Sequence, residues 1–383
     1  MYISVSHGQT PKDALVALGD GSFDFVTLHA NCDVGLAAVQ SDKLGINSSL
    51  HGATSCLGAM TQDGVSDGVA AFGLRDPDGA YGTAVAAFDG NPREAAKAAS
   101  RQALMNADRL GEQPDLVWIS ATPGTEEDVL AGIEDTVGQD VPIIGGSAAD
   151  NSVSGDWFVF DGTTQVTDGL VVSVLFPSGP VSFAYHNGYS PTDMEGVVTK
   201  AEGRTIHEID GKPAMEVYSK WTGGEVPQTP EGESTATILS GSTLWPLGRE
   251  ISQVGDVPFY LLAHPSVSHQ TGAMDLFATV AKGERLTLMN GTKTSLTTRA
   301  GRVAALARKA GHLSDTHIAG ALMIYCGGCM LSVRDQLDDV VAGVRAELDG
   351  APYLGAFTFG EQGALLKAGN RHGNLMISCI IFG

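Results

Sequence analysis

The stretch Val141–Asn151, VPIIGGSAADN, joins a short run rich in β-branched residues to two adjacent glycines and a series of small residues. The run predicts a buried β-strand, and Gly145 and Gly146 predict that this strand ends in a tight turn. Glycine is favoured where the backbone takes a positive φ or where another group approaches it closely. The stretch therefore raises the question of whether a ligand or only a neighbouring strand lies against these glycines.

The same plan occurs three times along the chain, in residues 23–60, 115–151 and 321–363. Each copy has an apolar strand, a turn of small residues, a helical segment, a second short apolar strand and a glycine-rich end. About 21 to 29 residues separate the first turn from the glycine, which is the length of a β-α-β unit. The three copies share this plan with little residue identity.

The segment after the second copy has a different residue pattern. Residues 156–190 alternate apolar and polar side chains and contain Gly-Thr-Thr and Asp-Gly turn signals, which are typical of antiparallel sheet. The sequence therefore predicts an α/β fold (α+β mixed) with β-α-β units and mixed sheets. We expect two related domains, residues 1–210 and 211–383, with a cleft between them.

Composition excludes some classes of partner. The 383-residue chain has a net charge of −21, whereas nucleic acids and anionic membrane surfaces attract basic proteins. The N-terminal residues lack the pattern of a signal peptide, and no apolar run is long enough for a membrane helix. Five cysteines are an odd set, which favours reduced thiols over a disulfide framework. We expect a cytoplasmic protein.

Three segments resemble a known family. They are IIGGSAADN (143–151), TKAEGRTIHEIDGKPAMEVYSKW (199–221) and PYLGAFTFGEQG (352–363). Together they are similar to the FIST proteins, and Glu208–Ala214 is the most specific piece. The resemblance covers roughly Leu15–Gly383 and identifies 1–210 as a FIST N-type domain and 211–383 as a FIST C-type domain. The chain departs from the family pattern at Gln362, where isoleucine is common, and in the thiol-rich YCGGCM (325–330).

The resemblance implies a function but no catalytic residue set. FIST domains occur alone or fused to bacterial signalling modules, amino acids and similar metabolites have been suggested as their ligands, and some members are haem proteins that sense nitric oxide. We therefore expect a bacterial sensory protein for signal transduction that binds a small polar metabolite such as an amino acid. Because the sequence contains no kinase, cyclase or receiver segment, such a sensor requires a separate signalling protein. The oligomeric state stays open.

The glycine-rich strand ends are the expected ligand site, because open α/β sheets usually hold ligands at the C-terminal ends of their strands. Asp150, Asn151 and Glu361 follow these ends and either bind an amine or hydroxyl group or close a turn. The expected ligand-binding residues are Thr54, Ser55, Cys56, Gly145, Gly146, Ser147, Asp150, Asn151, Cys326, Gly327 and Glu361.

Two alternatives to this function stay open. Cys326 and Cys329 form a C-x-x-C between a strand and a helix, so Cys326 or Cys56 is a candidate nucleophile of a thiol-dependent hydrolase or transferase; the same cysteines also suit tight packing. A haem-based nitric oxide sensor is the weaker alternative, since a single axial histidine leaves no motif. No four-ligand metal cluster and no phosphate-binding loop are evident, so we expect neither a metal nor any other cofactor.

Overall fold

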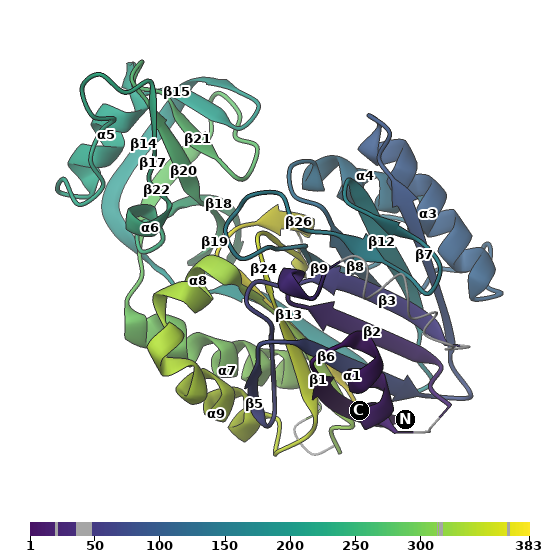
Figure 1. The fold of residues 1–383 in the computed structure, drawn as a ribbon. Coiled ribbons are helices and arrows are strands. Elements are labelled where there is room, and N and C mark those ends of the chain that lie inside the picture. The colour runs from purple at the N-terminus through teal and green to yellow at the C-terminus, as the bar shows by residue number, and fades with distance from the viewer. Residues whose placement is uncertain (20–21, 36–47, 312, 314–316, 366–367) are drawn as a thin grey trace.

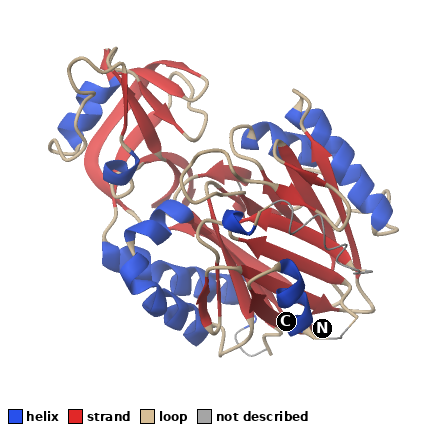
Figure 2. Ribbon diagram, in the orientation of Figure 1, coloured by secondary structure: helices blue, strands red, loops and turns tan. Residues whose placement is uncertain are grey.

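The computed structural model describes residues 1–19, 22–35, 48–311, 313, 317–365 and 368–383. Its strands form four sheets, and helices pack on their outer sides (Figures 1 and 2). The α/β prediction is confirmed, because both parallel and antiparallel pairs occur within the sheets and helices connect the parallel strands. Among the described helices, none is long and apolar enough to cross a membrane.

Three units with the same strand order make up a core. The first contains β1 (Tyr2–Gly8), α1 (Pro11–Leu18), β2 (Phe25–Ala30), β3 (Ser49–Thr54) and β6 (Val69–Arg75). The second contains β7 (Ala80–Ala87), α3 (Pro92–Asn106), β8 (Leu116–Ala121), α4 (Glu126–Val137), β9 (Ile143–Ser147) and β12 (Gly169–Phe176). The third contains β13 (Val181–Asn187), α7 (Lys293–Ala310), β23 (Gly320–Cys326), α8 (Gly327–Ser332), α9 (Leu337–Glu347), β24 (Tyr353–Thr358) and β27 (Met376–Phe382).

The pairing within the units is identical. Their neighbour orders are β1-β6-β2-β3, β7-β12-β8-β9 and β13-β27-β23-β24. In each unit the last two strands of that order are parallel and the other pairs are antiparallel. The three predicted copies are therefore the parallel halves of three equivalent units. The helical segment expected in the first copy lies largely outside the described residues, since residues 36–47 separate β2 from β3 there.

Each unit also contributes a hairpin that pairs with the sheet of another unit. The hairpins are β4 (Ala59–Thr61) with β5 (Gly64–Ser66), β10 (Val159–Phe160) with β11 (Gln165–Val166), and β25 (Glu361–Leu365) with β26 (Gly369–Gly373). The first-unit hairpin pairs with β24, the second-unit hairpin with β3 and the third-unit hairpin with β9. This cyclic exchange ties the three sheets together.

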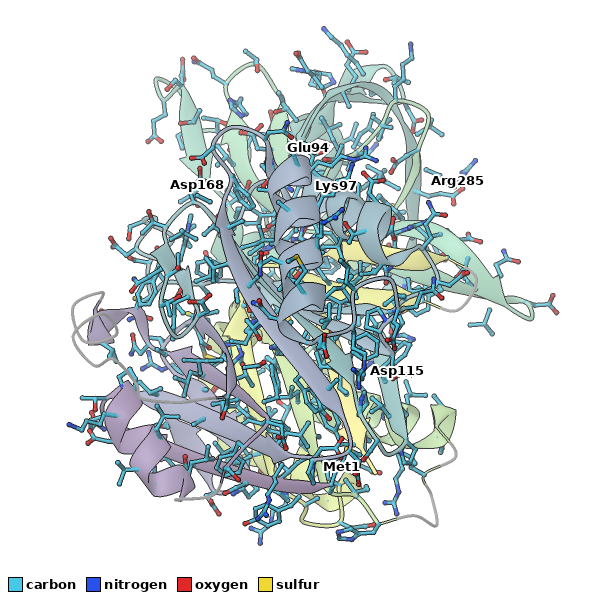
Figure 3. The ribbon with its side chains drawn as sticks, turned by 90° about the vertical axis from the view of Figure 1, so that its right-hand side faces the viewer. Met1, Glu94, Lys97, Asp115, Asp168 and Arg285 are labelled. Atoms are coloured by element: carbon cyan, nitrogen blue, oxygen red, sulfur yellow. The ribbon has the colours of Figure 1, made fainter. Side chains whose placement is uncertain are left out.

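The sheets share one apolar interior. It draws Phe25 and Phe72 from the first unit, Leu175 from the second, and Ile324 and Phe382 from the third. The opposite faces are covered by helices. In α3, for example, small apolar residues face the sheet, while Glu94 and Lys97 form a 3.9 Å ion pair on its outer surface (Figure 3). This amphipathic pattern is what places α3 on the outside of the core.

Residues 190–290 form an insertion between β13 and α7, at the upper left of Figure 1. Its elements are β14 (Ser190–Glu202), β15 (Thr205–Ile209), β16 (Lys212–Pro213), α5 (Ala214–Trp221), β17 (Thr235–Thr237), α6 (Leu239–Ser242), β18 (Leu247–Val254), β19 (Val257–Ala263), β20 (Pro265–His269), β21 (Met274–Leu276) and β22 (Arg285–Asn290). The insertion has an apolar cluster of its own, which includes Ile206, Tyr218 and Leu286. The expected domain boundary at residue 210 falls inside this insertion.

Candidate functional site

The glycine-rich ends of the three units meet in the core. Backbone hydrogen bonds join them in pairs: Cys56 N to Phe357 O (2.9 Å), Ala149 N to Thr54 O (3.1 Å) and Ser147 N to Gly360 O (2.8 Å). The sequence repeat thus locates three chain segments that come together although they lie far apart in the sequence. Atoms of the segments themselves fill the space where the three glycine-rich ends meet.

Gly145 and Gly146 have no positive φ. Close approach explains both residues. A Cβ atom on Gly145 would lie 1.9 Å from the carbonyl oxygen of Ile119, and one on Gly146 would lie 2.4 Å from Cγ2 of Thr358. Neighbouring strands, and not a ligand, lie against these glycines.

The first-unit residues Thr54, Ser55 and Cys56 are fully buried. The Thr54 hydroxyl accepts a hydrogen bond from Phe158 N at 3.2 Å, and the Ser55 hydroxyl accepts one from Phe357 N at 2.8 Å. Burial raises the pKa of the Cys56 thiol to about 12, so this thiol is protonated at neutral pH. All three side chains connect units of the core.

Asp150 and Asn151 are engaged with the protein itself. The Asp150 carboxylate accepts hydrogen bonds from five consecutive backbone N–H groups, of residues 152–156. Burial alone raises the pKa of Asp150, but these donors hold it below its ordinary value. The Asn151 side chain accepts from Leu57 N at 2.7 Å and donates to Asn31 at 2.8 Å. Asp150 therefore closes the turn of residues 152–156, whereas Asn151 joins its loop to Leu57 and Asn31 of the first unit.

The third-unit residues Cys326, Gly327 and Glu361 lie together. The Glu361 carboxyl group accepts from Met376 N at 2.9 Å and from the Thr358 hydroxyl at 3.0 Å. Burial, with Cys326 as a neighbour, raises the pKa of Glu361 well above its ordinary value. Burial likewise raises the pKa of the Cys326 thiol. Among the expected site residues, Cys326 is the one that lines a cavity described next.

A cavity of about 620 Å³ lies between the core and the insertion. The second unit supplies Pro123, Gly124, Glu126, Val153 and Trp157, the third supplies Cys326, Gly328, Leu331, Ser332, Phe359 and Asn374, and the insertion supplies Arg204, Leu239, Ser240, Thr243, His264 and Phe277. Most of the wall is apolar, and Trp157 packs edge-on against Phe359 at a centroid distance of 6.2 Å. Cavities of this size and character are typical ligand sites.

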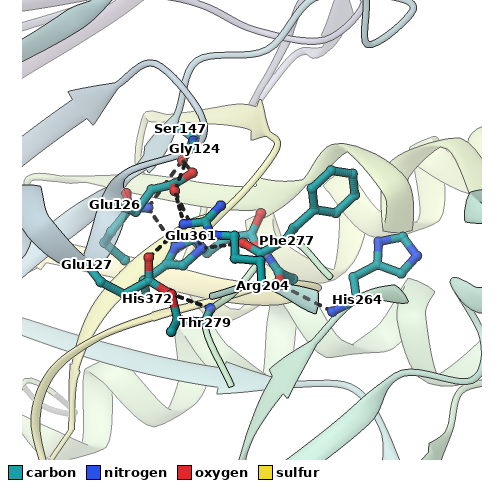
Figure 4. A network of polar contacts seen from close by, with 12 residues as sticks. Gly124, Glu126, Glu127, Ser147, Arg204, His264, Phe277, Thr279, Glu361 and His372 are labelled. Carbon is teal, nitrogen blue, oxygen red and sulfur yellow. Dashed lines mark hydrogen bonds and ion pairs between the residues drawn. The ribbon is translucent and has the colours of Figure 1, made fainter. Parts of the chain in front are cut away.

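A buried ion pair joins the core and the insertion beside this cavity (Figure 4). Nη2 of Arg204 in the insertion lies 2.6 Å from both Glu126 and Glu127 at the start of α4. Glu126 also accepts hydrogen bonds from Gly124 N at 3.1 Å and from the Ser147 hydroxyl at 2.8 Å. This links the predicted residue Ser147 to the cavity through one intervening side chain.

His372 completes the network on the core side. Its Nε2 lies 3.1 Å from the backbone oxygen of Phe277 in the insertion and 4.0 Å from Glu126. Burial alone raises the pKa of Glu126, but His372 and Arg204 hold it below its ordinary value. Glu127 is ionised for the same reasons: burial opposes, while His372 and Arg204 lower its pKa to about 2.

The sequence interpretation missed most of the cavity wall. Glu126 follows a strand and a Pro-Gly turn and opens an acidic first helical turn, which is a signal for a helix start rather than for a site. Arg204, Phe277 and Asn374 lie in ordinary turns or strands and carry no motif. Their proximity depends on how the insertion packs on the core.

A three-unit α/β core with an inserted sheet and a cavity between them is an architecture suited to binding small molecules. The FIST N domain matches residues 24–212, and the FIST C domain matches residues 214–364. The chain therefore belongs to the FIST family, whose domains are associated with sensory signal transduction.

Other comparisons are more distant. An uncharacterized protein of Methanocaldococcus jannaschii, MJ1623, is 38% identical over 96 residues, which is 24% of this chain and 18% of that protein. A cyanuric acid hydrolase from A. caulinodans aligns over 99% of this chain and 97% of its own, with 10% identity and a TM-score of 0.38. PurLQS from Thermotoga maritima aligns over 79% of this chain and 72% of its own, with 6% identity and a TM-score of 0.22.

Proposed function

We propose that this protein is a non-catalytic sensor and that its ligand binds in the 620 Å³ cavity between core and insertion. The observation that carries this proposal is the origin of the cavity wall, which comes from both parts of the chain. A ligand that contacts both parts stabilises one relative arrangement of them, and such a population shift is a signal that another protein can read. The proposal therefore includes a separate signalling partner.

The composition of the wall supports a small metabolite with an apolar body and one polar end. Trp157, Phe277 and Phe359 offer aromatic surface, while Arg204 and Asn374 offer hydrogen-bond donors. Amino acids, and above all those with apolar side chains, are the class of ligand to test first. No haem or other cofactor is part of this proposal.

The protonated thiols favour a sensor over a thiol enzyme. The thiolate is the nucleophilic form of cysteine, and burial raises the pKa of both Cys56 and Cys326. Burial also raises the pKa of Glu361, the neighbour of Cys326, and so disfavours the ionised form that a general base requires.

Native mass spectrometry and an absorption spectrum of the purified protein test whether a ligand is retained. Calorimetric titration with amino acids and related metabolites then gives affinities. We expect Phe277→Ala to weaken binding at least tenfold, because it removes aromatic wall, and Val257→Ala, at an exposed position outside the cavity wall, to leave binding unchanged. Equal binding by both variants, a strong Soret band, or turnover that depends on Cys326 or Cys56 would contradict the proposal.

A further inference from the structure

In the side-chain amide of Asn374, the oxygen is hydrogen-bonded and the nitrogen is not. Its Oδ1 accepts a hydrogen bond from the backbone N–H of His264 at 3.2 Å, and this contact fixes which end of the amide is oxygen. Its Nδ2 is buried and has no hydrogen-bond partner among the described residues. Asn374 is 2% exposed and lies on the cavity wall. A buried donor without a partner costs free energy that a ligand oxygen would recover.

Arg204 likewise retains donors. Its Nη2 is committed to Glu126 and Glu127, whereas Nε and Nη1 make no hydrogen bond within the described part of the chain. The acceptors at this end of the cavity are used instead: Glu126 receives hydrogen bonds from Arg204, Gly124 and Ser147. The free groups with fixed direction are therefore donors, and they require a ligand that accepts.

The charge of the same groups limits which acceptor fits. Glu126 and Glu127 are both ionised at neutral pH, and the protein itself pairs them, with Arg204 at 2.6 Å from both and His372 at 4.0 Å from Glu126. A ligand with a net charge of either sign would place an uncompensated charge in a largely apolar cavity, which is unfavourable. A ligand with no net charge avoids that cost.

We infer that the ligand is recognised through a carbonyl-type oxygen, on a molecule of zero net charge, by Asn374 Nδ2 with support from Arg204. Two sources share this chemistry: a neutral carboxamide and the carboxylate of a zwitterionic amino acid, whose ammonium group is attracted to the Glu126–Glu127 pair. The inference rests on the proposed function and narrows it to this class of ligand.

Four probes with one phenylpropyl body test the inference by calorimetric titration: phenylpropanamide, phenylalanine, phenylpropanoate and phenylpropylamine. We expect the amide, the zwitterion or both to bind at least tenfold more tightly than the anion and the cation. The two sources are distinguished by which of the net-neutral probes binds: phenylpropanamide represents the neutral carboxamide, and phenylalanine represents the zwitterionic amino acid. In the wild-type protein, the side-chain amide resonance of Asn374 should shift on binding, and this measurement does not depend on how a variant folds.

Asn374→Asp is the matched variant, because it keeps the oxygen that accepts from His264 and replaces the free donor by an acceptor. We expect it to weaken the preferred probe at least tenfold and to move the preference toward phenylpropylamine. The inference is overturned if wild-type protein prefers the amine or the anion, or if Asn374→Asp leaves the order unchanged. The sensor proposal survives those outcomes. If none of the four probes binds, the inference is overturned. The sensor proposal also fails if, in addition, no metabolite of the wider panel binds.

Discussion

Gly146 is surrounded by its own protein, and this gives the residue a measurable role in stability. Even one methyl group at this position would overlap the Thr358 side chain. We expect Gly146→Ala to lower the free energy of unfolding by about 1–3 kcal/mol, which is typical of overpacking in a closed core. Urea unfolding of the two proteins measures the difference.

Gly343 in α9 is the control for this substitution. A Cβ atom there meets no other atom within 4 Å, and alanine is the better helix former. We expect Gly343→Ala to raise the free energy of unfolding by about 0.5–1 kcal/mol. Equal effects of the two changes would contradict the packing explanation of Gly146.

At the scale of single residues, the sequence predicted which segments matter but not what each side chain does. Small residues at strand ends indicate close approach, yet a close approach by a ligand and one by a strand require the same glycine. Cys326 lines the cavity as well as belonging to the repeat, while Asp150 and Ser55 are engaged with backbone groups. That distinction depends on the partners, which come from other units.

The loop of residues 150–157 shows how one carboxylate shapes an element. Oδ2 of Asp150 accepts from the backbone N–H groups of Ser154, Gly155 and Asp156, at 2.7–3.0 Å. Val153 and Trp157 of this loop line the cavity, and Val153 has a φ of 58°, which is costly for a β-branched residue. The hydrogen bonds to Asp150 hold the loop in this conformation.

In Asp150→Asn, the three backbone N–H groups that converge on Oδ2 would meet either an amide N–H₂ group, which cannot accept, or an amide oxygen, which is a weaker acceptor than a carboxylate. We expect the free energy of unfolding to fall by about 1–3 kcal/mol at neutral pH. Ligand affinity should fall as well, since the loop carries part of the cavity wall. Urea unfolding and calorimetric titration measure the two effects.

Asp161→Asn provides the control on an exposed turn. Oδ1 of Asp161 alone accepts from Thr163 N and Thr164 N, each at 2.7 Å, and asparagine retains that oxygen. We expect a change within about 0.5 kcal/mol. A comparable loss from both substitutions would show that the convergence of donors on Asp150 is not what stabilises the loop.

At the scale of elements, local pattern predicted the parallel half of each unit and the antiparallel strands that follow the second copy, β12 and β13. Runs of apolar residues and helical periodicity are visible in 115–151 and 321–363, and both became β-α-β units. The exchanged hairpins were not predicted, because β10 pairs with β3 and β25 pairs with β9 across 100 or more residues of chain. Strands of two to five residues carry little periodicity of their own.

The whole molecule contains several histidines that are buried in neutral form. Burial lowers the pKa of each, with a smaller effect of Arg299 on His186 and of His29 on His51. The pKa is about 4 for His29, His186 and His264 and well below its ordinary value for His51. In the unfolded chain these groups take up protons near pH 6.5. As the pH falls from about 6.5 toward 4, the unfolded state therefore binds more protons than the folded state, and stability is lost.

Glu361 acts in the opposite direction within the same pH range. Its pKa is raised in the folded protein, so its contribution to stability is greatest in acid and is lost as the pH rises. Four histidines act against this one carboxyl group, so the unfolded state binds more protons overall and stability falls toward acid. Domains of ordinary stability have only about 5–15 kcal/mol in total.

We therefore expect the free energy of unfolding, measured by urea titration at a series of pH values, to fall as the pH is lowered from about 6.5 toward 4. His51→Gln removes one of the buried groups, which bonds to Ser173 and Ser120 at 3.0 Å, and should make the pH dependence less steep whatever it does to stability at neutral pH. A flat profile down to about pH 4.5, or the same slope for His51→Gln as for the wild-type protein, would mean that the buried histidines do not govern acid unfolding.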